Sequence, residues 1–390
     1  MHIPTQIEYM LRKLGDNGYE AYLVGGCVRD FLLGKTPDDY DITTSALPEE
    51  TMAVFEGDRV IPTGLKHGTV TVLYDGVASE ITTYRTETTY TDGRHPDKVE
   101  FSQNIKDDLC RRDFTVNAMA MDRYGNIIDL YGGRYDLENR IIRAVGDPAE
   151  RFAEDALRIL RAFRFASKLG FGIEEETLNA AVKLSPRLSL VSRERIFVEL
   201  EKLICGATAG TVLKCMCENK VFHFIFENPQ INLAALEYMD MIPRSVRIRF
   251  AALFLFDGRI NEHAKSLKPS NEFAASIKNI AKCKLPEKYD APTLRRLIFE
   301  YREAAIERAM AENRVEIGNR LIELLDTENC FSVTDLDING EEISIATARK
   351  GREIGEALNM LLLAVFDEKV ENNKFALTEY LKKVDNREKI

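Results

Sequence analysis

The chain has 390 residues, of which 45% are hydrophobic and 30% are charged, and its formal net charge is −10 at pH 7. This length exceeds one ordinary hydrophobic core, so we expect a globular protein of about two to four domains. The net negative charge excludes a general electrostatic attraction to nucleic acid, and any RNA binding must therefore come from local basic surface.

The apolar pattern and the cysteines indicate whether the chain enters a membrane, is secreted or binds zinc. The longest apolar runs, near residues 250–256 and 360–366, are too short to span a bilayer. Residues 1–4 show neither the basic start nor the long apolar stretch of a signal peptide. The seven cysteines contain no CxxC pair and stand apart from the five histidines, so their spacing predicts no zinc site. We expect a cytoplasmic protein that contacts no membrane.

The first chemical signal is a glycine turn between a short strand and a helix. Residues 21–24 are apolar and short enough for a buried strand, Gly25 and Gly26 end it, and helical spacing resumes from Cys27. Glycine lets the backbone approach a ligand closely, and the free N–H groups of a new helix attract phosphate oxygens. Arg29 adds donors one turn further on. The pattern favours a phosphate-binding turn or a plain tight turn, and it does not match the dinucleotide-binding fingerprint.

Two aspartates follow in a segment whose β-branched residues favour a strand from Asp39 to Thr44. In a strand, Asp39 and Asp41 would point to the same face, about 7 Å apart. Two like charges so placed repel each other, and Mg²⁺, which prefers carboxylates together with substrate phosphates, relieves that repulsion. The pair predicts a metal-dependent nucleotidyl transfer site, with a solvated acidic turn as the alternative.

Further short β-rich runs, separated by glycine-containing turns at 74–76 and 124–126, predict a sheet within the first 140 residues. Glu80 lies in the second strand of a predicted hairpin. It could face the acid pair as a third carboxylate or remain an exposed strand residue, and the pattern does not decide between the two. The predicted strands span residues 69–74, 78–84, 99–101 and 126–130.

Two polar segments also have a chemical interpretation. Thr86 to Pro96 is typical of a long loop, either a solvent-facing connector or a lever beside the site. Arg111 and Arg112 stand immediately before an apolar run. Arginine is always charged and binds phosphate oxygens in a bidentate manner, so the pair suits a triphosphate, although exposed arginine pairs are also common without function.

From about residue 140 to the end, helical periodicity replaces the β-rich pattern, so an α+β head precedes an all-helical remainder. Candidate joints lie at 206–210, 228–229 and 326–340. The clearest helix covers residues 147–169, with an Asp-Pro start and Gly170 as its stop. At about 100° per residue, its apolar face consists of Phe152, Ala156, Ile159, Leu160, Phe163 and Ala166.

The other side of this helix carries Arg158, Arg161 and Arg164, with Asp155 at the boundary. A carboxylate accepts hydrogen bonds and a guanidinium donates them, so Asp155 and Arg158 can address a base edge that presents an amino group beside an unprotonated ring nitrogen. Adenine and cytosine present that edge, whereas guanine and uracil do not. The helix therefore predicts either a solvated face with Asp–Arg pairs or a site that selects ATP and CTP without a nucleic-acid template.

In this order, the segments GG-x-x-R-D, DxD, RRDFTVNA, EDALRILRAFRF and SRER resemble the class II tRNA nucleotidyltransferases, the CCA-adding enzymes of the polymerase β superfamily. The resemblance covers about residues 20–200. It implies an α+β fold, in which a polymerase-β-like head with a small mixed sheet is followed by an all-α neck, body and tail. The implied domains are residues 1–140, 141–205, 206–330 and 331–390.

The resemblance also implies an activity and residue roles. The implied reaction adds C, C and A to the 3′ end of tRNA from CTP and ATP, with release of pyrophosphate. Asp39 and Asp41 would hold Mg²⁺, and Asp155 and Arg158 would read the base. The implied nucleotide contacts, to phosphates, sugar and base together, are Gly26, Arg29, Arg112, Asp155, Arg158, Arg161 and Arg164.

Three rival interpretations stay open: a partial enzyme that adds only CC or only A, a bacterial poly(A) polymerase, and a non-catalytic RNA-binding protein. The segment 63–70 resembles CCA-adding relatives rather than poly(A) polymerases, and the polar segment Thr86 to Pro96 favours the full reaction over CC addition. Asp39, Asp41 and Arg112 argue against a non-catalytic protein. The sequence does not identify the tRNA contacts of the helical half, and homodimer formation is left open.

Overall fold

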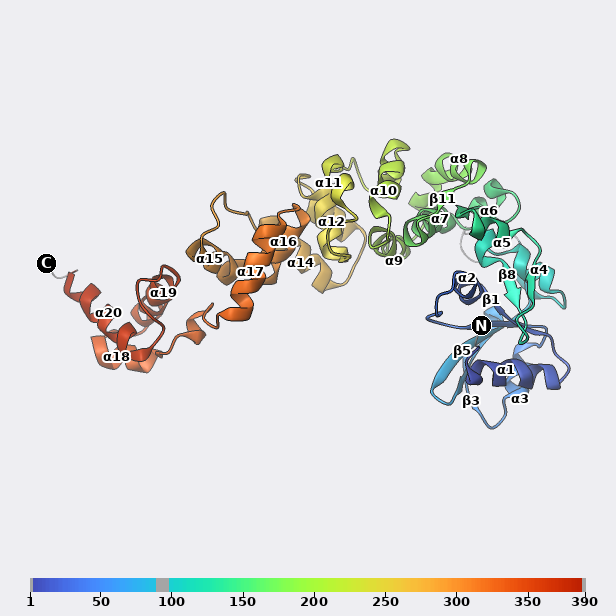
Figure 1. The fold of residues 1–390 in the computed structure, drawn as a ribbon, viewed down its shortest axis with the longest axis horizontal. Coiled ribbons are helices and arrows are strands. Elements are labelled where there is room, and N and C mark those ends of the chain that lie inside the picture. The colour runs from blue at the N-terminus through green and yellow to red at the C-terminus, as the bar shows by residue number, and fades with distance from the viewer. Residues whose placement is uncertain (1–2, 89–97, 388–390) are drawn as a thin grey trace. The chain divides into compact units, whose positions relative to one another are not determined.

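The computed structural model describes residues 3–88 and 98–387 of the chain. It divides into two compact units, Met1–Asn228 and Pro229–Ile390, which run from blue to green and from yellow to red in Figure 1. The boundary between them coincides with the Asn-Pro step named above as a candidate joint.

A seven-stranded sheet in the order β3-β4-β5-β2-β1-β8-β9 forms the centre of the first unit. β2 and β5 are parallel neighbours and the other neighbours are antiparallel, so the sheet is mixed, as predicted. Its strands are β1 (Ala21–Val24), β2 (Asp41–Thr44), β3 (Arg59–Gly64), β4 (Thr69–Tyr74), β5 (Val77–Thr83), β8 (Met119–Met121) and β9 (Ile127–Asp129).

The hairpin predicted at the 74–76 turn is β4–β5, in which Tyr74 pairs with Val77. Outside the large sheet, β6 (Arg85–Thr88) pairs with β7 (Lys98–Phe101). The predicted loop at 86–96 therefore begins inside a strand, and its remainder, from residue 89 onward, lies outside the described residues. A two-stranded parallel pair, β10 (Ile141–Ile142) and β11 (Gly172–Ile173), interrupts the helical region.

Helices pack on this sheet through amphipathic faces. α1 (Thr5–Asp16) buries Ile7, Met10, Leu11 and Leu14, whose spacing marks one helix face, and contacts β1 and β5. The remaining helices of the first unit are α2 (Gly26–Leu32), α3 (Pro48–Val54), α4 (Ile105–Cys110), α5 (Gly133–Glu138), α6 (Pro148–Glu154), α7 (Leu157–Leu169), α8 (Glu175–Leu184), α9 (Arg193–Ile204) and α10 (Ala209–Glu218), with 3₁₀ turns η1 (Leu65–His67), η2 (Thr115–Asn117), η3 (Ser185–Leu190) and η4 (Val221–Phe224).

The described part of the second unit is helical throughout, as predicted, and its helices enclose two apolar clusters. One cluster gathers around Ile298 and Leu321, and the other gathers around Leu361 and Leu377. The helices are α11 (Leu233–Tyr238), α12 (Val246–Phe254), α13 (Ile260–Ser266), α14 (Asn271–Lys282), α15 (Ala291–Tyr301), α16 (Glu303–Ala311), α17 (Val315–Thr327), α18 (Gly340–Thr347), α19 (Arg352–Phe366) and α20 (Lys374–Arg387), with the 3₁₀ turn η5 (Val333–Asp335).

Candidate active site

The predicted glycine turn joins β1 to α2. Gly25 has φ +78°, a backbone conformation that residues with a Cβ rarely adopt. A Cβ there would lie 3.1 Å from Nη1 of Arg112, and a Cβ on Gly26 would lie 3.6 Å from Nη2 of Arg29. Two of the predicted phosphate-contacting arginines therefore lie against the glycine turn, although they come from different segments of the chain.

Arg29 is buried, and its guanidinium is held on two sides. Nε and Nη2 donate to the two carboxylate oxygens of Asp30, at 2.9 and 3.0 Å, and Nη1 donates to Oδ1 of Asn117 at 2.7 Å. Asn117 in turn donates from Nδ2 to Oδ1 of Asp113 at 3.1 Å. This chain of contacts fixes the orientation of Arg29 beside the turn. Asn117 and Asp113 belong to the RRDFTVNA segment, but the sequence reasoning assigned them no role.

Three carboxylates gather where β2 begins beside its parallel neighbour β5. The predicted strand from Asp39 was wrong at its start, because β2 begins at Asp41 and Asp39 precedes it. Glu80 is the direct neighbour of Asp41 across the parallel strands. Although Asp41 as a residue is exposed, desolvation of its carboxyl group and the charges of Asp39 and Glu80 raise its pKa to about 6, against the opposing charge of Arg112.

The repulsion of the Asp41 carboxylate by Asp39 and Glu80 indicates a site that could bind a cation. A carboxylate whose pKa is raised by neighbouring negative charges is stabilised in its charged form by a divalent ion, and oxygen ligands of this kind suit Mg²⁺. Asp39 and Asp41 are the residues that would hold it. Within residues 3–88 and 98–387, no three carboxylate, imidazole or thiolate side chains are arranged to enclose a metal ion. A third-ligand role for Glu80 stays a prediction.

Arg112 is anchored by a buried acid. Its Nη2 donates to Oδ2 of Asp108 at 3.0 Å, while Nη2 of Arg111 donates to Oδ1 at 2.6 Å. Burial of Asp108 would raise its pKa, but the charges and hydrogen bonds of the two arginines outweigh this effect and lower it. Asp108 therefore stays ionised and holds Arg112 near Gly25 and Asp41.

The long helix predicted over residues 147–169 is two helices. Asp147 and Gly170 cap the ends as predicted, and the six predicted face residues are buried. The helix breaks at Asp155, however, whose backbone is extended with φ −137° and ψ 107°. Oδ1 of Asp155 accepts from the backbone N–H of Leu157 at 3.0 Å, so its side chain satisfies a donor in the first turn of α7.

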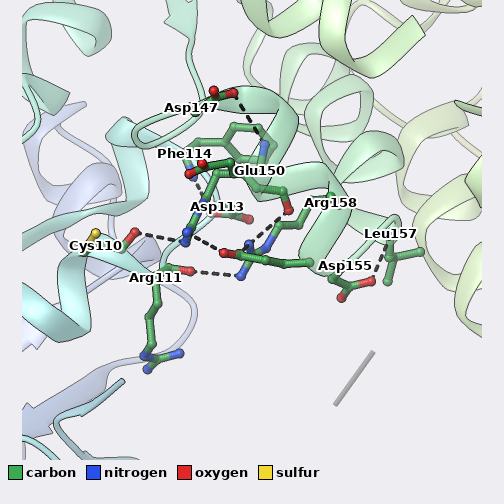
Figure 2. A network of polar contacts seen from close by, with 12 residues as sticks. Cys110, Arg111, Asp113, Phe114, Asp147, Glu150, Asp155, Leu157 and Arg158 are labelled. Carbon is green, nitrogen blue, oxygen red and sulfur yellow. Dashed lines mark hydrogen bonds and ion pairs between the residues drawn. The ribbon is translucent and has the colours of Figure 1, made fainter. Parts of the chain in front are cut away.

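The two predicted base-reading side chains are held by different partners. Oδ2 of Asp155 pairs with Nη2 of Arg195 at 2.7 Å. Arg158 pairs with Glu154. It also donates from Nη2 to the backbone oxygen of Arg111 at 2.9 Å, as Figure 2 shows. Asp155 therefore lies at the helix break and Arg158 lies in the first turn of α7, and protein partners hold both side chains in position.

The arginines Arg161 and Arg164 lie among acidic partners and are not on a freely solvated face. Arg161 donates twice to Oδ2 of Asp113, and Nε of Arg164 lies 2.6 Å from Oε2 of Glu199 on α9. Glu199 is buried and also lies 3.6 Å from Nη1 of Arg161. The sequence reasoning did not single out Glu199. The available signal was a carboxylate on the apolar stripe of α9, which Ile196, Leu200 and Leu203 define.

Comparisons with known proteins match this organisation. Residues 21–143 match the family model of the poly A polymerase head domain, 170–234 that of the probable RNA and SrmB- binding site of polymerase A, and 250–381 that of the putative tRNA nucleotidyltransferase domain 2. A mixed sheet that carries a glycine turn and an acid pair, in a chain with these matches, defines a nucleotidyltransferase of the poly(A) polymerase type.

Relatives that match over nearly the full chain identify the family more specifically. The chain is 34% identical to the CCA-adding enzyme of Leuconostoc mesenteroides subsp. mesenteroides, over 97% of this chain and 96% of that one. It is 38% identical to that of Ligilactobacillus salivarius, over 96% and 95%. The solved Bacillus stearothermophilus CCA-adding enzyme, in complex with CTP, is 32% identical and covers both chains completely, with a TM-score of 0.82. The chain belongs to the CCA-adding enzymes, a family of tRNA nucleotidyltransferases.

Proposed function

We propose that this protein completes the 3′ end of tRNA by adding C, C and A from CTP and ATP. Family membership over nearly the full chain supports the reaction, and the assembly of Gly25, Arg112 and Asp41 supports its location. In each step the tRNA 3′-hydroxyl attacks the α-phosphorus of the nucleotide. A new phosphodiester bond forms, and the bond to pyrophosphate breaks.

The two aspartates would supply the negative charge that binds the metal ion for this step. Asp39 and Asp41 would hold Mg²⁺, which lowers the pKa of the attacking hydroxyl and neutralises charge on the phosphates when bound. Arg112, positioned by Asp108, would donate to the triphosphate beside the glycine turn. Arg29, which lies beside Gly26, would add a second cationic contact.

Base selection would use the break between α6 and α7. A carboxylate accepts about four hydrogen bonds, and two partners of Asp155 are identified above, so its oxygens keep capacity for the amino group of adenine or cytosine. Arg158 would donate to the adjacent ring nitrogen. Because each side chain is fixed by protein partners, the same pair can accept both bases and reject uracil and guanine.

The helical domains would carry out base recognition and tRNA binding. We propose residues 141–205 as a neck that carries the base-reading pair, and residues 206–330 and 331–390 as a body and tail that bind tRNA. None of the helices among the described residues is long and apolar enough to cross a membrane. Because tRNA, CTP and ATP are dissolved in the cytoplasm, we propose that the protein works there.

The decisive experiment uses three tRNA substrates, ending at the discriminator base, at C and at CC. Each is incubated with the protein, Mg²⁺, CTP and ATP, and the 3′ ends are sequenced. We expect all three to end in CCA. Products that stop at CC, extension of the CC substrate alone, or long A tails would replace this proposal with CC addition, A addition or poly(A) synthesis, respectively.

A further inference from the structure

Phe165 on α7 is an aromatic residue that the proposed mechanism does not use. Its ring is 5% exposed and packs edge-on against Phe114, with ring centroids 5.7 Å apart. Three guanidinium groups lie over the same ring. Their Cζ atoms stand 3.9 Å from the centroid for Arg164, and 5.4 Å for both Arg29 and Arg161.

Such a concentration of like charge needs compensation. Carboxylates supply part of it: Asp30 pairs with Arg29, Asp113 with Arg161, and Glu199 lies 2.6 Å from Arg164 and 3.6 Å from Arg161. The negative face of an aromatic ring attracts cations, and the attraction is strongest where water is excluded. Phe165 therefore offsets part of the repulsion among the three groups, and it does so without adding an anion to the site.

The ring also leaves hydrogen-bond donors available. A guanidinium stacked on a ring keeps its N–H groups directed outward in its own plane, whereas a carboxylate partner consumes them. Over the described ranges, Nε of Arg164 lies 2.6 Å from Oε2 of Glu199 without forming a hydrogen bond, the Nη groups have no partner within the protein, and the side chain is 10% exposed. A phosphate or sugar oxygen of a bound nucleotide is the kind of acceptor that these groups lack.

We propose that Phe165 is a positioning residue for nucleotide binding, whose ring holds Arg164, and with it Arg29 and Arg161, oriented toward the nucleotide. This inference rests on the proposed function, because it takes these arginines as nucleotide contacts. It adds that their arrangement depends on an aromatic side chain that does not itself touch the reacting atoms.

The experiment compares Phe165→Leu with Phe163→Leu. Both residues are buried aromatics of α7, but no guanidinium from the part of the chain that the structure describes lies over the ring of Phe163. We measure the dissociation constant of CTP without tRNA, the KM and kcat for CTP and ATP addition, and the melting temperature. For Phe165→Leu we expect the dissociation constant and KM to rise about five- to tenfold, with kcat within about twofold of wild type. For Phe163→Leu we expect a lower melting temperature with unchanged CTP affinity.

Two further variants complete the test. Phe165→Tyr keeps the ring and should bind CTP within about threefold of wild type, whereas Phe165→Met removes the ring with a flexible apolar replacement and should behave as the leucine variant does. The inference is overturned if the ring-less variants bind CTP as wild type does, or if Phe165→Tyr is as weak as Phe165→Leu. Absence of nucleotide addition by the wild-type protein would instead refute the proposed function.

Discussion

Oδ2 of Asp113 accepts hydrogen bonds from both Nε and Nη2 of Arg161, at 2.8 and 2.6 Å, across 48 residues of sequence. Burial would raise the pKa of Asp113, but the charge of Arg161 and the hydrogen bonds from Asn117 and Arg161 lower it to about 2. The pair therefore ties the segment after α4 to helix α7 through a carboxylate that stays ionised far into acid.

Asp113→Asn should destabilise the protein by about 1–3 kcal/mol at pH 7, because Arg161 loses its charged acceptor. The pKa of Asp113 is lower in the folded protein than in the unfolded chain, so its stabilisation is present above about pH 4 and is lost as the pH falls toward 2. Urea unfolding followed by circular dichroism should show the wild-type advantage at pH 7 shrinking over that window. The exposed Asp16→Asn control should show no loss, and a pH-independent difference would contradict the assignment.

Asp39→Asn and Asp41→Asn should each lower CMP and AMP incorporation by about 10³-fold or more, since metal-assisted transfer contributes several kcal/mol of barrier lowering. CTP should still bind, because the base and triphosphate contacts proposed here lie on other residues. Incorporation is measured with Mg²⁺ on tRNA ending at the discriminator base, and EDTA should reproduce the loss in wild type. Near-normal incorporation by either variant would refute the metal-binding role.

Asp155→Ala and Asp155→Asn separate the two tasks of this residue. Asparagine retains an N-terminal capping oxygen, so Asp155→Asn should keep the melting temperature closer to wild type, whereas Asp155→Ala should cost about 1 kcal/mol more. Both remove the carboxylate that would accept from the base amino group, so both should raise UMP incorporation relative to CMP. The check is a competition assay with mixed nucleotides. Preserved discrimination in both variants would show that another residue reads the base.

Gly25→Ala should destabilise the protein by about 1–2 kcal/mol, because a Cβ is strained at positive φ. The new Cβ would also stand 3.1 Å from Nη1 of Arg112, so the KM for nucleotides should rise. The matched substitution Gly15→Ala lies in helix α1 with open space around it and should instead stabilise by about 0.5–1 kcal/mol. Thermal melting and steady-state kinetics of the two variants test this contrast, and equal effects would contradict it.

Local patterns predicted the parts of the fold that local forces determine. The strand over 21–24, the 69–74 strand of the hairpin, and the helix start at Asp147 follow from apolar runs, turns and a cap within a few residues of each other. The sheet was incomplete in the prediction: β3 contains Pro62, which argues against a strand, and β8 is only three residues long.

The break at Asp155 escaped prediction for a physical reason. Phe152, Ala156 and Ile159 keep their helical spacing across the break. The sequence therefore shows continuous helical periodicity, although the backbone is not helical at Asp155. The ion pair between Asp155 and Arg195, which is distant in sequence, helps to stabilise the break. Glu199 was missed for the same reason, since its two arginines lie on another helix. The family resemblance identified the nucleotide-contacting arginines and the site aspartates. The acids that orient these arginines, Asp108, Asp113 and Glu199, are evident only from the fold.

The parallel pairing of β2 with β5 has a consequence for the order of folding. Two parallel neighbours cannot be joined by a tight turn, so β2 must wait until residues 45–79 have been synthesised and arranged before β5 can pair with it. The β4–β5 hairpin uses the same strand β5 but closes over only a few residues, so it should form first once residues 69–83 are available. During synthesis on the ribosome, Asp41 and Glu80 would therefore meet late, after much of the apolar packing that must overcome their mutual repulsion is in place.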